Sequence, residues 1–178
     1  MPLLTKIYLS LFTTETKALE HPLNTDQQKD GSYLTCMEHS DHAKYCMQDA
    51  YVQVFADCVR NTRLQTGIEL PEHIEHYAVA LLAVHVDRAD FLPKTTFAQA
   101  LYNISNARTA KELGDTCLFV TGVFPEYGVN RRYYTDIGRT AYSSIELELF
   151  RDIAHSFDVV QTLINCTVSS QVQQLGTL

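Results

Sequence analysis

The amino-acid sequence predicts an all-α fold, a single domain built as a bundle of six or seven helices. Apolar residues recur at helical spacing through most of the 178 residues. Glycine and proline are scarce, at 7 and 5 residues, whereas an all-β protein needs many of both for its tight turns. Residues 77–86 and 113–124 are apolar nearly all round, so we expect two largely buried helices at the centre of the bundle.

The first third of the chain is predicted to hold a short helix, a polar loop and a long helix. Residues 3–13 carry apolar side chains at helical spacing, although the alternation in KIYLSLF leaves a strand as an alternative. Residues 20–33 are polar and contain turn signals, which predicts a loop. The long helix begins near Ser40, a favourable N-cap residue, and ends near Gln65, just before the helix-stopping Gly67.

Three further helices are expected in the middle of the chain. Pro71 opens the first of them, at a position where its missing N–H does no harm. Thr95 or Thr96 caps a shorter helix that runs through Asn106. The sequence TAKE at residues 109–112 is typical of a capping box, in which a threonine hydroxyl and a glutamate carboxylate each bond a free N–H of the first turn.

The last third of the chain is predicted to form two helices. One spans residues 131–146. The other turns an apolar stripe toward the core, made of Leu149, Ile153, Phe157, Val160 and Ile164. Residues 168–178, which are rich in glutamine and serine, are expected to form a frayed tail.

The charge of the chain disfavours nucleic acid as a partner. Lysine and arginine number 14 against 21 acids, which gives a formal net charge of −7. Nucleic-acid binding depends on the neutralisation of phosphates by basic side chains. The densest basic groups are Arg131 and Arg132 with Arg139, and Arg60 with Arg63. Such groups are more typical of a solvated helix face than of a binding stripe.

A cytoplasmic location without membrane association is expected. The five cysteines are odd in number and show no C-x-x-C spacing. The N-terminus lacks the basic start and the small-residue cleavage site of a signal peptide. No segment approaches the roughly 20 apolar residues that cross a bilayer.

The stretch CMEHSDHAKYC, residues 36–46, concentrates cysteine and histidine and is a candidate metal site. In one continuous helix its ends would lie about 15 Å apart, so its four ligands could not share an ion. With a helix from Ser40, His42 and Cys46 lie four residues apart on one side, and Asp49 follows one turn later. Zinc or iron would suit these ligands, but the spacing matches no standard zinc pattern, and a solvent-facing helix surface is the alternative.

Glu72 and His76 form a second candidate metal-binding pair, four residues apart in the sequence EHIEH. Di-iron bundles use Glu-x-x-His motifs on two of their helices, and this chain contains none. Both side chains also project away from the apolar stripe of their helix. The alternative is an acidic first turn with surface Glu–His pairs. No motif implies a cofactor, so its identity is unknown from the sequence.

His85 and Asp115 are candidates for the polar lining of a ligand pocket. Each interrupts one of the two nearly all-apolar segments, and a buried polar group without a partner costs about 1–3 kcal/mol. His85 is either a general base or ligand-binding group, or a core histidine bonded to a tyrosine or a backbone carbonyl. Asp115, if buried, needs an arginine or a network of hydroxyl groups.

Tyr134 and Tyr142 complete the pocket candidates. They lie beside small residues on one predicted helix, where tyrosines can line an apolar pocket that offers a few hydroxyls. Ordinary half-buried packing is the alternative.

Two functions remain open. The first is a non-catalytic interaction or regulatory module that acts as a homo-oligomer or through a protein partner. Small residues, at Gly114 and Gly122 and at Gly138 and Ala141, would let a partner helix approach. The second is a small-molecule- or metal-binding enzyme with a pocket lined by His, Asp and Tyr. The lack of Walker, G-x-G-x-x-G, G-x-S-x-G and H-E-x-x-H motifs favours the first.

Overall fold

The computed structural model describes part of the chain, and within that part the fold is all-α. It covers residues 38–86, 88, 92–124 and 130–175, with the side chains among them from 48 to 171. These ranges contain seven helices and no strand, which confirms the predicted fold class. The predicted helix at 3–13 and the predicted loop at 20–33 lie outside the described residues.

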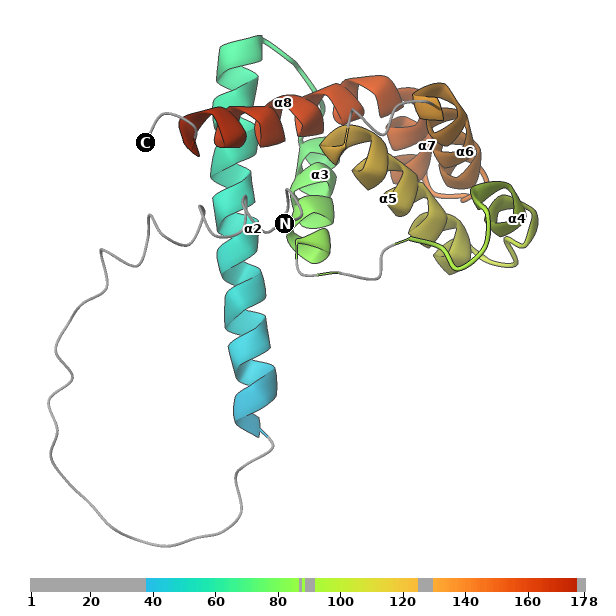
Figure 1. Cartoon of the computed structure of the whole chain (residues 1–178), viewed down its shortest axis with the longest axis horizontal. Coiled ribbons are helices and arrows are strands. Elements are labelled where there is room, and N and C mark those ends of the chain that lie inside the picture. The colour runs from blue at the N-terminus through green and yellow to red at the C-terminus, as the bar shows by residue number, and fades with distance from the viewer. Residues whose placement is uncertain (1–37, 87, 89–91, 125–129, 176–178) are drawn as a thin grey trace, which may run out of the picture.

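The helices follow one another as Figure 1 shows. In chain order they are α2 (Glu38–Thr66), α3 (Glu72–His85), α4 (Phe97–Tyr102), α5 (Ala107–Val123), α6 (Arg131–Ser143), α7 (Glu148–His155) and α8 (Phe157–Leu175). The long helix α2 lies beside α3 and is crossed by α8, and its N-terminal part extends well past the other helices (Figure 1). None of the helices in the described ranges is both long and apolar enough to span a bilayer.

Helix α5 lies at the centre of the bundle. It contacts α3, α4, α6 and α8, and all of its residues from Leu113 to Val123 are buried. The prediction of a largely buried helix is therefore confirmed for α5. Helix α3 fits less well, because Ala80 and Val84 are exposed although the neighbouring positions are buried.

Small residues bring α5 close to its neighbours within the same chain. A Cβ at Gly114 would lie 2.5 Å from the Tyr142 ring on α6, and one at Gly122 would lie 2.7 Å from Ile164 on α8. A Cβ at Gly138 would meet the Phe157 ring at 2.7 Å. The space that the sequence suggested for a partner helix is thus filled by the chain's own aromatic and aliphatic side chains.

The helix caps confirm one prediction and correct two others. Thr96 caps α4, and its hydroxyl accepts a hydrogen bond from the backbone N–H of Gln99. Helix α5 begins at Ala107 rather than at the TAKE motif, because Asn106 caps it and Thr109 completes the capping box from the third position. Pro71 is the N-cap residue of α3 rather than its first helical residue.

The predicted final helix is in fact two helices that meet at Ser156. The Ser156 N–H bonds to the Asp152 carbonyl and ends α7, and the Ser156 carbonyl accepts from the N–H groups of Val159 and Val160. This break lets α7 pack on α6 while α8 packs on α5 and α2. The tail expected to fray from residue 168 differs as well, because α8 continues to Leu175 and Val168 is buried.

Candidate functional site

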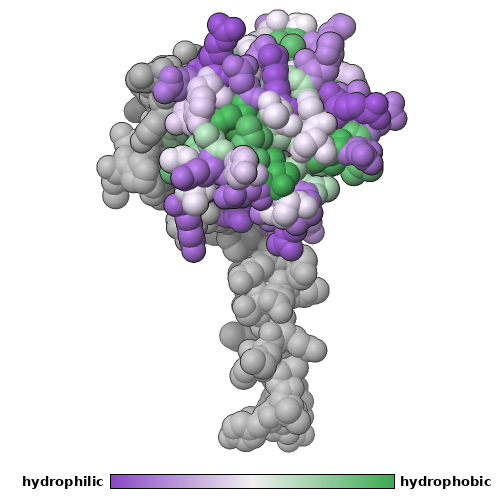
Figure 2. Space-filling model, turned by 90° about the vertical axis from the view of Figure 1, so that its right-hand side faces the viewer, coloured by the Kyte–Doolittle hydropathy of each residue, from purple (hydrophilic) through white to green (hydrophobic). Residues whose placement is uncertain are grey.

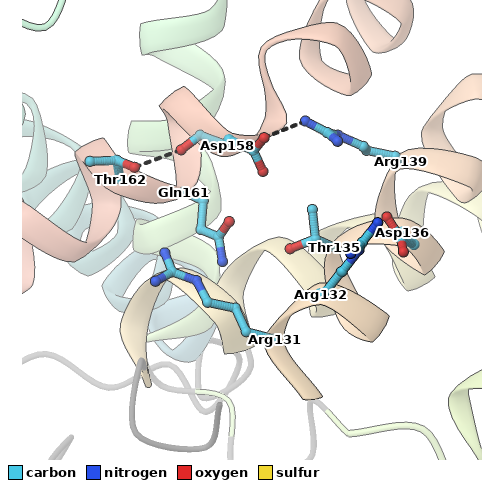
Figure 3. Close-up of a pocket in the computed structure, with 8 residues that line it drawn as sticks. All are labelled: Arg131, Arg132, Thr135, Asp136, Arg139, Asp158, Gln161 and Thr162. Carbon is cyan, nitrogen blue, oxygen red and sulfur yellow. Dashed lines mark hydrogen bonds and ion pairs between the residues drawn. The ribbon is translucent and has the colours of Figure 1, made fainter. Parts of the chain in front are cut away.

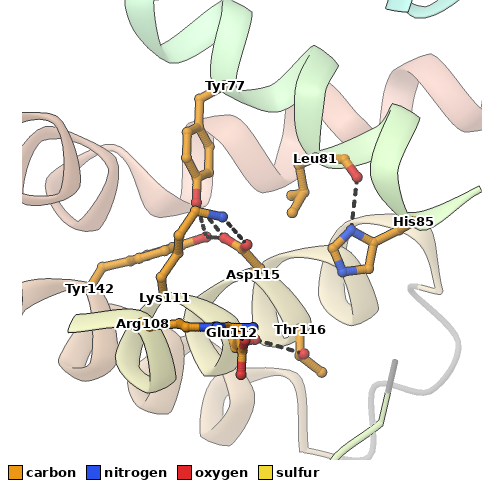
Figure 4. Close-up of polar contacts among 9 residues, drawn as sticks. All are labelled: Tyr77, Leu81, His85, Arg108, Lys111, Glu112, Asp115, Thr116 and Tyr142. Atoms are coloured by element: carbon orange, nitrogen blue, oxygen red, sulfur yellow. Dashed lines mark hydrogen bonds and ion pairs between the residues drawn. The ribbon is translucent and has the colours of Figure 1, made fainter. Parts of the chain in front are cut away.

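A buried carboxylate links three helices in the middle of the bundle. Asp115 on α5 accepts hydrogen bonds from the hydroxyls of Tyr77 on α3 and Tyr142 on α6, the second at 2.8 Å. Its other oxygen pairs with the Lys111 ammonium at 2.6 Å (Figure 4). The hydroxyl network expected for Asp115 is therefore present, and the cation is Lys111 rather than an arginine.

The environment of Asp115 keeps both tyrosines protonated. Burial raises the pKa of Tyr142, and the adjacent Asp115 charge raises it further. The same two causes, in the same order, raise the pKa of Tyr77. Both phenols consequently act as hydrogen-bond donors to the carboxylate, which is the role that a stable buried network requires.

His85 is a core histidine bonded to a backbone carbonyl, one of the two alternatives that the sequence left open. Its Nδ1 lies 2.9 Å from the Leu81 carbonyl, and its ring stacks on Phe119 with centroids 4.7 Å apart. Because a carbonyl only accepts, Nδ1 carries the proton and donates it. Burial lowers the pKa of His85, so the ring is neutral near pH 7.

His85 and Asp115 share a small cavity of about 80 Å³ between α3 and α5. Its wall also includes Tyr77 and Lys111, together with the apolar Ala80, Leu81 and Val84. Since one water occupies about 30 Å³ of liquid, the cavity has room for only two or three waters. Tyr134 does not line this cavity; its ring packs instead on Phe97, 4.7 Å away between centroids.

The candidate metal ligands are placed only in part. His42 and Cys46 belong to α2, but their side chains lie outside the described ones, and Asp49 is exposed on the same helix. Glu72 and His76 form an exposed pair on α3, with 3.8 Å between Oε1 and Nε2. Among the described side chains, no group of three or more His, Cys, Asp or Glu residues is arranged to hold a metal ion.

A larger cleft of about 580 Å³ lies between α6 and α8, and we call it the arginine cleft. Its lining consists of Arg131, Arg132, Thr135, Asp136, Arg139, Asp158, Gln161 and Thr162 (Figure 3). The guanidinium of Arg131 extends from α6 toward Gln161 on α8 (Figure 3). At the other end of the cleft, Arg139 pairs with Asp158 at 2.6 Å and joins the two helices.

Several donor groups in the arginine cleft have no acceptor. Arg131 and Arg132 form no ion pair with any described carboxylate. The Nε of Arg139 is buried and has no hydrogen-bond partner among the described residues. The residue Thr135 is only 7% exposed, and its hydroxyl makes no hydrogen bond within the described part of the chain. Among these groups only the Arg139 Nε is both buried and without a partner; Arg131 and Arg132 are exposed, so their guanidinium groups face solvent and are free to contact a ligand.

The spacing of three residues on α6 is a sequence signal for one wall of this cleft. Arg131, Thr135 and Arg139 are spaced four residues apart, so they lie on one face of α6 over about 12 Å. From the sequence alone, Arg131 and Arg139 are typical of a solvated helix face. Only the packing of α8 opposite this face turns it into one wall of a cleft, and no sequence pattern predicts that contact.

Exposed apolar residues do not form one dominant surface on the face shown in Figure 2. That face carries a short band of apolar side chains set among polar ones (Figure 2). In the described part of the chain, the large exposed apolar residues include Leu92 and Leu147, each 58% exposed, on separate segments. Apolar residues scattered in this way are common on protein surfaces and need no functional explanation.

Comparison with known proteins adds no relative to this description. No family model, no curated protein and no solved structure matches the chain.

Proposed function

We propose that the protein is a non-catalytic helical module that acts by binding an anionic ligand in the arginine cleft. One observation carries this proposal: a row of donors on α6 faces a cleft and lacks acceptors. The row comprises the solvent-exposed Arg131 guanidinium, the Thr135 hydroxyl and the buried Arg139 Nε. An anion that entered the cleft would supply the missing acceptors.

The charge and the size of the cleft support this proposal. The chain has a net charge of −7, yet three arginines gather in one cleft with two aspartates. The guanidinium group matches carboxylate and phosphate oxygens in planar, bidentate geometry, which makes arginine the usual residue for such ligands. The cleft holds about 580 Å³, which is room for a small molecule, and it is open to solvent because most of its lining residues are exposed.

Calorimetric titration of the full chain with inorganic phosphate tests the proposal. We expect saturable binding that Arg131→Gln weakens by about tenfold, the cost of losing one charge-assisted contact. Arg108→Gln is the matched control, because Arg108 is exposed on α5 and pairs with Glu112 away from the cleft. Equal weakening by both variants, or no saturable binding to the unmodified chain, would overturn the proposal.

Thr135→Val separates binding from folding. The valine keeps the shape of the threonine and removes a hydroxyl that makes no hydrogen bond with a described residue, so stability should change little. Phosphate binding should nevertheless weaken, because the hydroxyl is one of the donors in the row. Unchanged phosphate affinity in this variant would contradict the assigned role of Thr135.

A second candidate function is an enzyme or binding protein that uses the cavity beside Asp115. The observation in its favour is that His85 and Asp115 line the same cavity. Its small volume weighs against it, because sites for ordinary metabolites begin near 300 Å³. Fragment binding followed by NMR would favour this function if the His85 ring resonances moved while the Arg139 side-chain resonances did not.

We place this activity in the cytoplasm. The odd number of cysteines supports this location, and the three described ones, Cys58, Cys117 and Cys166, are all free thiols.

The arginine cleft supports a small ligand more strongly than a second copy of the chain, because the small residues proposed as contacts for a partner helix are covered by side chains of the same chain.

A further inference from the structure

We infer that the ligand of the arginine cleft joins one anionic group to a hydroxyl-bearing body, the chemistry of a sugar phosphate or a sugar acid. This inference rests on the proposed function, because it assumes that the cleft binds an anion. The inference adds that the rest of the ligand carries hydroxyl groups. The reason is that two carboxylates share the cleft with the arginines.

The charge of the lining fits a single anionic group. Three arginines and two aspartates line the cleft, which leaves a formal charge of +1. Asp158 already neutralises Arg139. The free positive charge therefore lies with Arg131 and Arg132, and a polyphosphate or a nucleic acid would bring further negative groups against the two aspartates.

The two aspartates of the cleft can accept hydrogen bonds from donor groups on a ligand. Asp158 uses Oδ2 to hold Arg139, while its other oxygen makes no hydrogen bond with a described residue and is directed into the space between α6 and α8 (Figure 3). The Asp136 carboxylate likewise makes no hydrogen bond with a described residue, and because both aspartates are exposed, their unpaired oxygens are reached by water and can be reached by a ligand. An ionised carboxylate only accepts, so these oxygens suit the hydroxyl groups of a polyol.

The length of the cleft suits a molecule of this kind. Arg131 and Arg139 are eight residues apart on α6, or about 12 Å along the helix axis. The anionic group would lie at the Arg131 end, and the hydroxyl groups would extend toward the Asp158 end. The Thr135 hydroxyl lies between the two ends and can either donate or accept.

Four probes titrated into the full chain test this inference: inorganic phosphate, ribose 5-phosphate, gluconate and ribose. We expect ribose 5-phosphate or gluconate to bind at least about tenfold more tightly than inorganic phosphate, and ribose to show no measurable binding. Preference for ribose 5-phosphate would assign a phosphate head group, and preference for gluconate a carboxylate. If phosphate binds and neither larger probe binds more tightly, the inference fails while the proposed function stands. If none of the anions binds, the proposed function itself fails.

Asp158→Ala makes the test sharper, because it should move two affinities in opposite directions. Loss of the carboxylate frees Arg139, so inorganic phosphate should bind more tightly. The advantage of the preferred larger probe over phosphate should shrink, because the acceptor for its hydroxyls is gone. Asp57→Ala is the control, since Asp57 is an exposed aspartate on α2 that pairs with Arg60. An unchanged affinity ratio in Asp158→Ala, with its helical circular dichroism intact, would overturn the inference.

Discussion

Tyr142 donates its hydroxyl hydrogen to the Asp115 carboxylate across the α5–α6 interface, and the edge of the same ring covers Gly114 one residue earlier. One fully buried tyrosine thus provides both the closest packing between these helices and a partner for the buried charge. We therefore interpret the polar cluster around Asp115 mainly as part of the architecture, which is why the arginine cleft is the site that we propose for a ligand.

Tyr142→Phe should destabilise the protein without changing its fold. The variant keeps the ring over Gly114 but leaves Asp115 with one hydroxyl donor fewer, and hydrogen bonds to charged groups contribute about 1.5–3 kcal/mol. We expect a loss of about that size in the free energy of unfolding, measured in urea. Tyr102→Phe, at a tyrosine that is 90% exposed, should change it by less than about 0.5 kcal/mol. Equal effects of the two variants would contradict the role given to Tyr142.

Gly114→Ala should destabilise the protein although alanine is the better helix former. A Cβ at this position would lie 2.5 Å from the Tyr142 ring, so α5 and α6 would have to move apart. Overpacking of this kind costs about 1–3 kcal/mol, which exceeds the gain of about 1 kcal/mol in helix propensity. Thermal unfolding should therefore show a lower Tm. A raised Tm would mean that the two helices are not in close contact.

The stability of the protein should fall as the pH drops below the ordinary pKa of histidine. Burial lowers the pKa of His85 in the folded chain, so the unfolded chain takes up this proton first. The stabilising contribution is complete above about pH 6.5 and is lost as the pH falls toward the lower folded value. The loss in this window reaches at most about 1.4 kcal/mol per pH unit. His85→Phe should flatten it in urea unfolding, and an identical pH profile in both proteins would contradict the burial of His85.

The described cysteines should differ sharply in reactivity. Burial raises the pKa of the Cys117 thiol to about 12, whereas Cys166 is partly exposed. The thiolate is the reactive form, so iodoacetamide at about pH 8 should label Cys166 and spare Cys117 in the native protein. Peptide mapping by mass spectrometry resolves the two sites, and both should be labelled in urea. Native labelling of Cys117 at the rate of Cys166 would place Cys117 outside the core.

The parts of the fold that the sequence predicted are those that depend on local pattern. The apolar run from Leu113 to Val123 predicted the buried helix α5, and Thr96, one of two candidate caps, predicted the start of α4, because each signal lies within a few residues. The break at Ser156 was missed, because apolar residues keep their spacing through the turn and the reason for the break is the separate packing of α7 and α8. The predicted N-cap of α5, Thr109, is three residues later than the observed one, because Asn106 is an equally good cap residue.

The sequence predicted which kind of group a candidate site would need, but not which residues from other helices would supply it. That a buried Asp115 needs donors follows from electrostatics, and the i−4 position of Lys111 could have been read from the sequence. Tyr77 lies 38 residues from Asp115 and reaches it only because α3 packs on α5. Tyr134, on the same helix as Tyr142, faces α4 instead, so its proximity in sequence was misleading.

The most direct test of the arginine cleft is the NMR spectrum of arginine side chains during titration with inorganic phosphate. Arg131 makes no ion pair with a described carboxylate, whereas the Nε of Arg108 already bonds to Glu112 at 3.1 Å. Phosphate in the cleft should shift the Arg131 side-chain resonances in a saturable way and leave those of Arg108 in place. Equal, non-saturating shifts at both arginines, or no shift at Arg131, would contradict an anion site between α6 and α8.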